Sequence, residues 1–226
     1  MKKIAFISSL VAGFFMMTSC GVQMLPIALD TAEDNDPYYV INAQKNNDYI
    51  EKFTATSIFL DNLSGVWGFE KDACRDFGVE TNIVYKGMGS LHLKWDKSKK
   101  GCDWIGVGFM WNNWQTVDMS DILDTWALEF WIRTADGDEI GSIPLNFYFL
   151  DNNNKSTPVI ACNSQFYEGF GVNSTWKRVQ IPLKFFRMVD SGLNPVEISQ
   201  LGMSFEGTAE IYLDEMRLVE LVKDEE

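Results

Sequence analysis

A glycine-rich turn leads directly into an alternating strand in the segment Tyr85-Lys86-Gly87-Met88-Gly89-Ser90-Leu91-His92-Leu93. Similar turn chemistry recurs as Ala-Asp-Gly-Asp at residues 135–138 and as Asp-Asn-Asn-Asn at residues 151–154. Glycine, asparagine and aspartate favour turns because they adopt backbone conformations that other residues avoid. Between these turns, polar and apolar residues alternate, which is typical of strands with one buried face.

The segments between the turns predict about ten short strands, all after residue 56. We expect strands at residues 57–60, 81–85, 90–95, 104–110, 126–134, 144–150, 157–162, 177–182, 198–205 and 209–220. Short helical turns are expected only near residues 118–123, 183–189 and 195–198. Strands of this number and spacing predict an all-β fold, a β-sandwich or jelly roll.

Two further signatures follow the glycine-rich turn in order. A polar cap and then an apolar strand are found in Asp118-Met119-Ser120 and Leu128-Glu129-Phe130-Trp131-Ile132-Arg133. The last signature combines Trp176-Lys177-Arg178-Val179-Gln180-Ile181-Pro182-Leu183 with Ile211-Tyr212-Leu213-Asp214-Glu215-Met216-Arg217-Leu218. Together, the motifs resemble the galactose-binding-like β-sandwich of carbohydrate-binding modules, most nearly the family 11-like group, over about residues 57 to 222. The same fold also serves as an accessory domain without sugar affinity.

This resemblance implies a structural calcium ion beside the glycine-rich turn. Calcium takes about six to eight oxygen ligands from carboxylates, carbonyls and water. The resemblance places side-chain ligands at Asp214 and at Asp61 or Glu70, and carbonyl ligands at Lys86 and Gly89.

Asp214 lies in an otherwise apolar strand, where a carboxylate needs a partner. On strict alternation it shares a face with Tyr212 and Met216. The partner is calcium, an arginine or the polar groups of a strand edge.

Aromatic residues make up 14% of the chain and include eight tryptophans, more than core packing usually requires. Sugar rings stack on flat aromatic faces, while their hydroxyl groups bond to amides and carboxylates. We therefore expect a sugar-binding site built from aromatic residues beside polar ones. The candidate ligand-binding residues are Trp67, Trp104, Trp111, Asn113, Trp114, Tyr167 and Glu168.

Alternation divides the segment 104–111 into two faces. One face carries Ile105, Val107, Phe109 and Trp111, and the other carries Trp104, Gly106, Gly108 and Met110. A strand face made bare by glycines suits a ligand lying across it, a bulge or a closely packed neighbour. Two further tryptophans match the apolar pattern of the family and are assigned to the core, Trp131 and Trp176.

The sequence does not predict an enzyme. It contains no Glu-x-Asp-x-x-Glu array of the kind that places two carboxylates for glycoside hydrolysis. It also lacks a Gly-x-Ser-x-Gly nucleophile elbow. Its single histidine, His92, alternates with polar residues and is expected at the surface.

The N-terminus has the pattern of a cleaved signal peptide. Two lysines precede the apolar run 4–17, which is too short to span a bilayer and ends at Thr18-Ser19-Cys20-Gly21. This pattern resembles bacterial lipoproteins, which implies lipidation of Cys20; the alternative is a secreted protein in which Cys20 is incidental. We expect a signal peptide at residues 1–19, a lipidated flexible leader at 20–56 and the β-sandwich at 57–226.

Three cysteines remain after Cys20 in an oxidising compartment. Cys74 and Cys102 lie in polar turns and can pair, whereas Cys162 lies in an apolar stretch and is expected to be a buried thiol.

Net charge and anchor together define the expected role. Removal of the signal peptide leaves 17 basic and 32 acidic residues, a net charge of −15 that disfavours nucleic acid. We expect a non-catalytic, lipid-anchored protein at the cell envelope, with Gly21 permitting the outer membrane. It would hold a polysaccharide or oligosaccharide near glycan-uptake or degrading proteins. The alternatives are a protein-interaction or adhesin-type lipoprotein without a glycan ligand, and a structural lipoprotein.

Overall fold

The computed structural model describes residues 55–221 except residues 62, 64 and 138, so the predicted signal peptide, Cys20 and almost all of the leader lie outside the described residues. The strands in chain order are β1 Ser57–Phe59, β2 Val66–Trp67, β3 Arg75–Glu80, β4 Ser90–Asp96, β5 Gly106–Phe109, β6 Trp126–Thr134, β7 Ser142–Asp151, β8 Ile160–Asn163, β9 Lys177–Pro182, β10 Ile198–Phe205 and β11 Thr208–Glu220. Two short 3-10 helices precede β10, η2 at Leu183–Phe186 and η3 at Pro195–Glu197.

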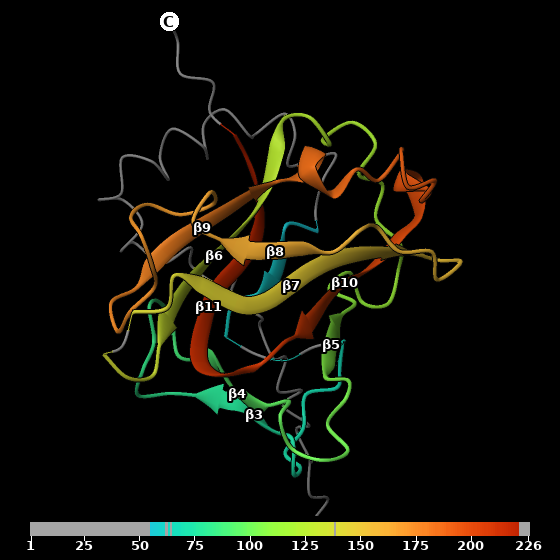
Figure 1. Cartoon of the computed structure of the whole chain (residues 1–226). Helices are drawn as coiled ribbons and strands as arrows, with labels where there is room; N and C mark the ends of the chain where they lie inside the picture. Colours follow the sequence, from blue (N-terminus) through green and yellow to red (C-terminus); the bar gives the residue numbers. More distant parts are fainter. Residues whose placement is uncertain (1–54, 62, 64, 138, 222–226) are drawn as a thin grey trace, which may run out of the picture. The chain divides into compact units, whose positions relative to one another are not determined.

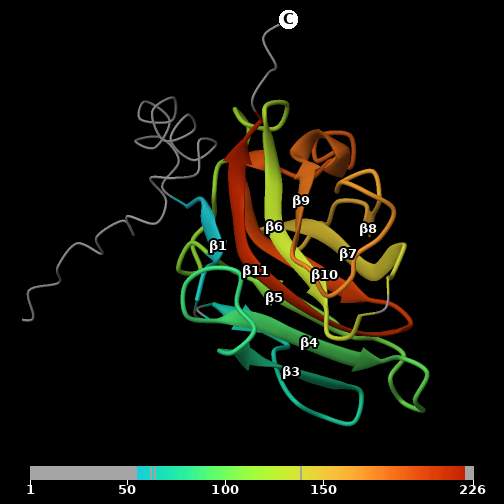
Figure 2. The ribbon, with the colours of Figure 1, turned by 90° about the vertical axis from the view of Figure 1, so that its left-hand side faces the viewer.

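The described strands form two antiparallel sheets, which confirms the all-β prediction. Sheet A has the order β3-β4-β11-β6-β9, with β1 also paired to β11, and sheet B has the order β2-β5-β10-β7-β8. In Figure 1, β7 and β8 lie in front of β6 and β9, and Figure 2 shows the same strands after a 90° turn.

The core lies between the two sheets because each long strand turns its apolar positions inward. Phe130 of β6 meets Phe147 of β7 with ring centroids 5.0 Å apart. At the other end, Trp95 of β4 meets Phe205 of β10 at 4.8 Å. All four side chains are buried, so rings from both sheets fill one shared core.

The predicted strand boundaries are confirmed for β6, β9 and β10. The strand predicted at 81–85 is wrong, because the chain turns there: Glu80 accepts hydrogen bonds from the backbone N–H groups of Thr81 and Asn82 at 2.8 and 2.6 Å. The edge strand β3 precedes this turn instead. Its alternation is weak because Gly78 has no side chain and Val79 is exposed.

A bulge interrupts β11 and overturns one prediction from strict alternation. The register shifts between Asp214 and Arg217, and Glu215 between them has a left-handed φ of 48°. Beyond the bulge, Met216 points into the core and is fully buried, while Asp214 stays on the opposite face. Asp214 and Met216 therefore do not share a face.

The structure shows that Cys74 and Cys102, whose pairing the sequence left open, are joined, and it confirms the buried thiol of Cys162. Cys74 and Cys102 form a disulfide with Cα atoms 5.5 Å apart. Cys162 is a buried free thiol, and burial raises its pKa to about 12. Across the described residues, we find no helix that combines the length and apolar character needed to cross a membrane.

Candidate functional site

Glycines line part of the outer face of sheet B. Gly106 and Gly108 of β5 have tryptophan rings lying directly on their Cα atoms. A Cβ atom added to Gly106 would lie 2.5 Å from the Cζ2 atom of Trp104, and one added to Gly108 would lie 2.1 Å from the Nε1 atom of Trp67. The predicted bare face of β5 is therefore covered by two tryptophan rings.

The rings of Trp67 and Trp104 are nearly parallel, with centroids 5.9 Å apart and an interplanar angle of 14°. Because each ring rests on its own glycine, the two lie side by side along the sheet. Trp104 is 62% exposed. Trp67 is half-buried and its Nε1–H donates to Oε1 of Gln200 at 3.0 Å, which fixes its ring.

Tyr148 of β7 extends this arrangement across the sheet. Its ring lies on Gly202 of β10, where an added Cβ atom would be 2.3 Å from the ring. The register places Trp67, Gly108, Gly202 and Tyr148 opposite one another in one row. We call Trp67, Trp104 and Tyr148 the aromatic platform.

Polar side chains lie in the adjoining positions of the same face. Gly106 pairs with Ser204 of β10, which pairs with Asn146 of β7. The Asn146 amide lies 3.5 Å from the Ser204 hydroxyl. Amides and a hydroxyl group beside flat rings are the groups that a neutral sugar uses for hydrogen bonding and stacking.

The other tryptophans predicted after β5 have different surroundings. Trp111 is half-buried, packs edge-on against Phe149 and donates from Nε1 to the carbonyl oxygen of Ala55 at 2.6 Å. Trp114 is 68% exposed, and both it and Asn113 have a left-handed φ. Because Trp104 precedes β5 and Trp114 follows it, the structure places these two rings at opposite ends of the strand.

The candidate ligand-binding residues Tyr167 and Glu168 lie on the other face of the sandwich. Tyr167 is buried, and its hydroxyl group donates to the carbonyl oxygen of Gly141 at 2.9 Å. Glu168 is exposed next to it. Both residues border a hollow of about 800 Å³ over β6 and β9. Tyr167 and Glu168 are therefore not brought together with the aromatic platform.

Trp131 and Trp176 border the same hollow and are half-buried, so their assignment to the core is wrong. Trp131 points outward from β6, where its ring stacks on Tyr85 at 3.9 Å and 15°. Both tryptophans have apolar neighbours in the sequence and are partly covered by other side chains, so the sequence pattern does not distinguish them from core residues.

The outer face of sheet A, beside this hollow, also contains a buried carboxylate, that of Glu129. Glu129 accepts hydrogen bonds from Arg178 at 2.7 Å, from Gln180 at 2.8 Å and from two nitrogens of Arg217 at 3.1 and 3.2 Å. These partners compensate the charge of Glu129, so the group has a clear structural role.

The carboxylate of Asp214 holds the glycine-rich turn through backbone N–H groups. Its Oδ2 atom accepts from Tyr85 at 2.7 Å and from Lys86 at 3.2 Å, and its Oδ1 atom accepts from Glu215 at 2.8 Å. Burial, which disfavours the charged form, raises the pKa of Asp214 to about 6.

Asp61 holds the other end of this turn. It accepts hydrogen bonds from the backbone N–H groups of Met88 and Gly89, the latter at 2.9 Å. Glu70 instead pairs with Arg75. Among the described residues, no three His, Cys, Asp or Glu side chains gather as metal ligands would.

The residues at the turn therefore fit calcium only in part. Asp61 and Asp214 supply carboxylates, but Lys86 and Gly89 direct N–H groups toward them, and an N–H group is not a calcium ligand. The calcium site stays a prediction.

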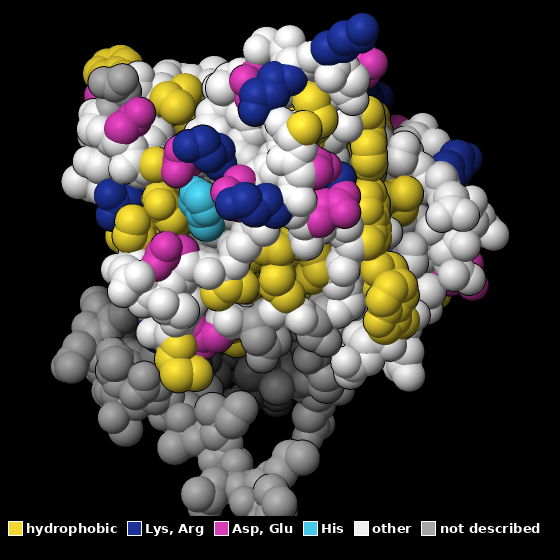
Figure 3. Space-filling view, turned by 90° about the horizontal axis from the view of Figure 1, so that it is seen from below, with side chains coloured by type: hydrophobic (Ala, Val, Ile, Leu, Met, Phe, Trp, Pro, Cys, Tyr) yellow, Lys and Arg dark blue, Asp and Glu magenta, His cyan; other side chains and the backbone are white. Residues whose placement is uncertain are grey.

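His92 lies on the lower face of the molecule, among acidic and basic side chains (Figure 3). Its Nε2 atom is 2.9 Å from Oε1 of Glu210, and its ring stacks on Tyr212. These contacts give it a structural role on a partly exposed strand face.

A β-sandwich that packs aromatic rings against glycines, with amides beside them, offers the flat surfaces and polar groups that suit a sugar ligand. The family model described as "Carbohydrate binding domain 30" matches residues 55–220, and the chain belongs to this family. The protein is thus a non-catalytic carbohydrate-binding protein. The resemblance to carbohydrate-binding modules is confirmed.

Solved structures show the same fold at low sequence identity. A family 30 carbohydrate-binding module shares 18% identity at a TM-score of 0.58, over 76% of this chain and 90% of that one. The family 30 module of the cellulosomal cellulase Cel9D-Cel44B of Clostridium thermocellum shares 17% at 0.57, over 73% and 96%. A family 11 module from Clostridium thermocellum, in complex with a β-1,3-1,4-mixed-linked tetrasaccharide, shares 12% at 0.51, over 74% and 97%. A search of curated proteins found none similar to this chain.

Proposed function

We propose that the aromatic platform binds an extended β-linked glucan chain. The observation that carries this proposal is the side-by-side, nearly parallel arrangement of Trp67 and Trp104 on the glycines of β5. Two such rings offer stacking surfaces to neighbouring sugar residues of one chain. The β-1,3-1,4-linked tetrasaccharide bound by the family 11 module, and the cellulase that carries a family 30 module, support a β-glucan as the ligand class.

The surroundings of the platform favour a neutral sugar. Gln200, Asn146 and Ser204 supply uncharged hydrogen-bonding groups, and the chain as a whole has a net charge of −13. An acidic polysaccharide would be repelled by this charge.

Affinity electrophoresis of the full chain in a gel containing mixed-linkage β-glucan tests the proposal. We expect Trp67→Ala and Trp104→Ala each to abolish retardation. Arg187→Ala is the control, because Arg187 is exposed and pairs with an exposed residue, Asp190. Unchanged retardation of Trp104→Ala would contradict the proposal. A wild-type chain that no glycan retards would favour the alternative of an envelope protein that docks another protein.

We also propose that Cys20 carries a lipid anchor that holds the protein at the cell envelope, near glycan-uptake or degrading proteins. Two or more acyl chains are needed for a stable anchor. The supporting observation is the apolar run that ends at Thr18-Ser19-Cys20. Cys20→Ser should move the protein from the membrane to the soluble fraction of the envelope, and a variant that stays with the membrane would contradict this.

A further inference from the structure

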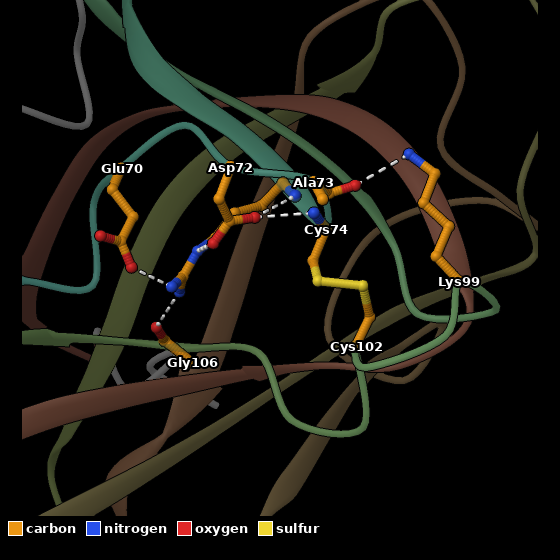
Figure 4. A network of polar contacts seen from close by, with 8 residues as sticks. Glu70, Asp72, Ala73, Cys74, Lys99, Cys102 and Gly106 are labelled. Carbon is orange, nitrogen blue, oxygen red and sulfur yellow. Dashed lines mark hydrogen bonds and ion pairs between the residues drawn. A yellow bond between two sulfur atoms is a disulfide. The ribbon is translucent and has the colours of Figure 1, made fainter.

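Trp104 lies between two residues that are each held by the same turn of the chain, Cys102 and Gly106. Figure 4 shows Cys102 and Gly106 beside this turn. Cys102, two residues before Trp104, is disulfide-bonded to Cys74. Gly106, two residues after Trp104, accepts a hydrogen bond at its carbonyl oxygen from Nη1 of Arg75 at 3.3 Å. The disulfide and the hydrogen bond therefore start from adjacent residues of the same turn, Cys74 and Arg75.

The guanidinium group of Arg75 contacts three residues, Glu70 and Asp72 of its own turn and Gly106 of β5. Its Nε–H donates to Oδ2 of Asp72 at 3.1 Å, and its Nη2 group pairs with Glu70. Asp72 also accepts the backbone N–H groups of Cys74 at 2.7 Å and Arg75 at 3.0 Å, which closes the turn. Only a planar guanidinium, with several donors in fixed directions, can serve all of these acceptors at once.

The Gly106 carbonyl oxygen that Arg75 contacts also touches the segment that carries the other tryptophan. Gly68 directly follows Trp67 and has a φ of 75°; a Cβ atom added to it would lie only 2.3 Å from this oxygen. The same Gly106 forms the floor beneath the Trp104 ring. The hydrogen bond from Arg75 to Gly106 therefore lies where the backbone beneath the Trp104 ring meets the backbone that follows Trp67.

The position of Arg75 in the fold strengthens this link. Arg75 begins β3, the edge strand of sheet A, whereas Gly106 begins β5 of sheet B. The side chain is only 13% exposed although its partners Glu70 and Asp72 lie near the surface. It thus bridges the two sheets at the edge beside the platform.

We propose that Arg75 is a positioning residue of the glycan site, which sets the spacing and the parallel orientation of Trp67 and Trp104, and that the Cys74–Cys102 disulfide restrains the same segment. This inference rests on the proposed function, since it assigns a role within the same site. Arg75 acts through the backbone of Gly106 and Gly68 and does not contact the glycan.

The test compares Arg75→Gln, Arg75→Lys and the double variant Cys74→Ser/Cys102→Ser with wild type. Arg217→Gln is the matched control, because Arg217 is an ion-paired, partly buried arginine of sheet A that pairs with Glu129 on the face away from the platform. Three readouts are measured on each full chain: affinity for mixed-linkage β-glucan, unfolding in urea, and the exciton signal of the Trp67–Trp104 pair in circular dichroism. The last is identified as the component missing from Trp104→Phe.

We expect Arg75→Gln to weaken glucan binding at least about tenfold and to lose the exciton signal. Arg75→Lys should recover part of both, the double cysteine variant should show a smaller loss of both, and Arg217→Gln should match wild type in both. If Arg75→Gln does not fold, Arg75→Lys and the cysteine variant carry the comparison.

The outcomes separate the two proposals. Retained affinity and a retained exciton signal in the Arg75 variants would overturn the positioning role and leave the proposed function intact. If wild type does not bind β-glucan but its exciton signal still depends on Arg75, the proposed β-glucan ligand is contradicted and the positioning role is supported. If Arg217→Gln loses as much glucan affinity as Arg75→Gln, the loss comes from general destabilisation of the fold, and the inference is overturned.

Discussion

At the level of single residues, the surroundings of each tryptophan separate a role in binding from a role in packing. Trp104 is 62% exposed and lies flat on a glycine. Trp111 packs against Phe149 and donates a hydrogen bond to the carbonyl oxygen of Ala55. An exposed flat ring contributes little to folding, whereas a packed ring with a satisfied N–H contributes several kcal/mol.

The first prediction concerns these two residues. Trp111→Ala should lower the free energy of unfolding by about 3 kcal/mol, because it leaves a cavity and an unpaired carbonyl group. Trp104→Ala should change that free energy by less than about 1 kcal/mol and abolish glucan binding. Urea denaturation and affinity electrophoresis of both variants check this. Equal destabilisation by both changes would contradict the division of roles.

The second prediction follows from the buried carboxylate of Asp214. Its folded-state pKa of about 6 exceeds its ordinary value of 3.8, so the folded protein keeps a proton that the unfolded chain has already released. In EDTA-treated protein, the contribution of this group is fully present below pH 3.8 and is lost as pH rises to about 6. Urea denaturation of wild type and Asp214→Asn from pH 4 to 7 should therefore show a difference in stability that changes over this window and is constant above it. A constant difference throughout would contradict the prediction.

The calcium prediction is tested in the same samples. A metal that binds only the folded protein stabilises it by mass action, so EDTA should lower the melting temperature and added calcium should restore it. Asp214→Asn should show neither response. No response of wild type that contains calcium by elemental analysis would reject calcium at this turn.

At the level of strands, the platform depends on residues that have no side chains. Gly106 and Gly108 alternate with buried residues of β5, so their Cα atoms face outward at the positions where rings from neighbouring segments lie. Register with β10 then adds Gly202 beneath the third ring, that of Tyr148.

The next prediction is that Gly108→Ala displaces the ring of Trp67. The new methyl group would lie 2.1 Å from Nε1 of Trp67, and the ring must move because the strand beneath it is fixed on both sides. We expect strongly weakened glucan binding with a destabilisation of only about 1–2 kcal/mol. Gly78→Ala is the matched control, since nothing lies within 4 Å of the added Cβ atom. Equal binding by the two variants would contradict the prediction.

Long strands with many apolar positions could be predicted from the sequence even where a register shift interrupts them, whereas short or weakly patterned strands could not. The predicted bounds hold for β6, β9 and β10, although the register of β10 shifts between Ile198 and Gln200. In contrast, β2 has only two residues, and β3 contains Gly78 and an exposed Val79. The tryptophans of the platform were predicted as candidates because of their glycine neighbours. Tyr148 was missed because its place beside them depends on the register of four strands, which local pattern does not encode.

For the molecule as a whole, the two outer faces of the sandwich differ in chemistry. The face of sheet A combines the rings of Trp131 and Trp176 with Glu129 and its arginine partners, whereas the face of sheet B combines rings with amides and hydroxyl groups. The core between the sheets keeps these faces apart. Binding at the platform therefore involves few charges, although the chain has a net charge of −13.

The last prediction is that glucan affinity is nearly independent of salt. Screening weakens interactions between charges but leaves ring stacking intact. The dissociation constant should change less than about twofold between about 0.05 and about 0.5 M NaCl, measured by isothermal titration calorimetry. A steep dependence on salt would indicate a charged ligand and contradict the neutral β-glucan.

The glycines beneath the two tryptophan rings, Gly106 and Gly108, also affect how glucan binding can be recognised in other sequences. Each ring is specified twice, once by the aromatic residue and once by the missing side chain beneath it. A relative that retains both tryptophans but carries alanine at the position of Gly106 or Gly108 would pass a search based on aromatic residues and still lack the flat surface. The pair of glycines is therefore as diagnostic of a working platform as the tryptophans themselves, and binding can be lost in evolution through a single added methyl group.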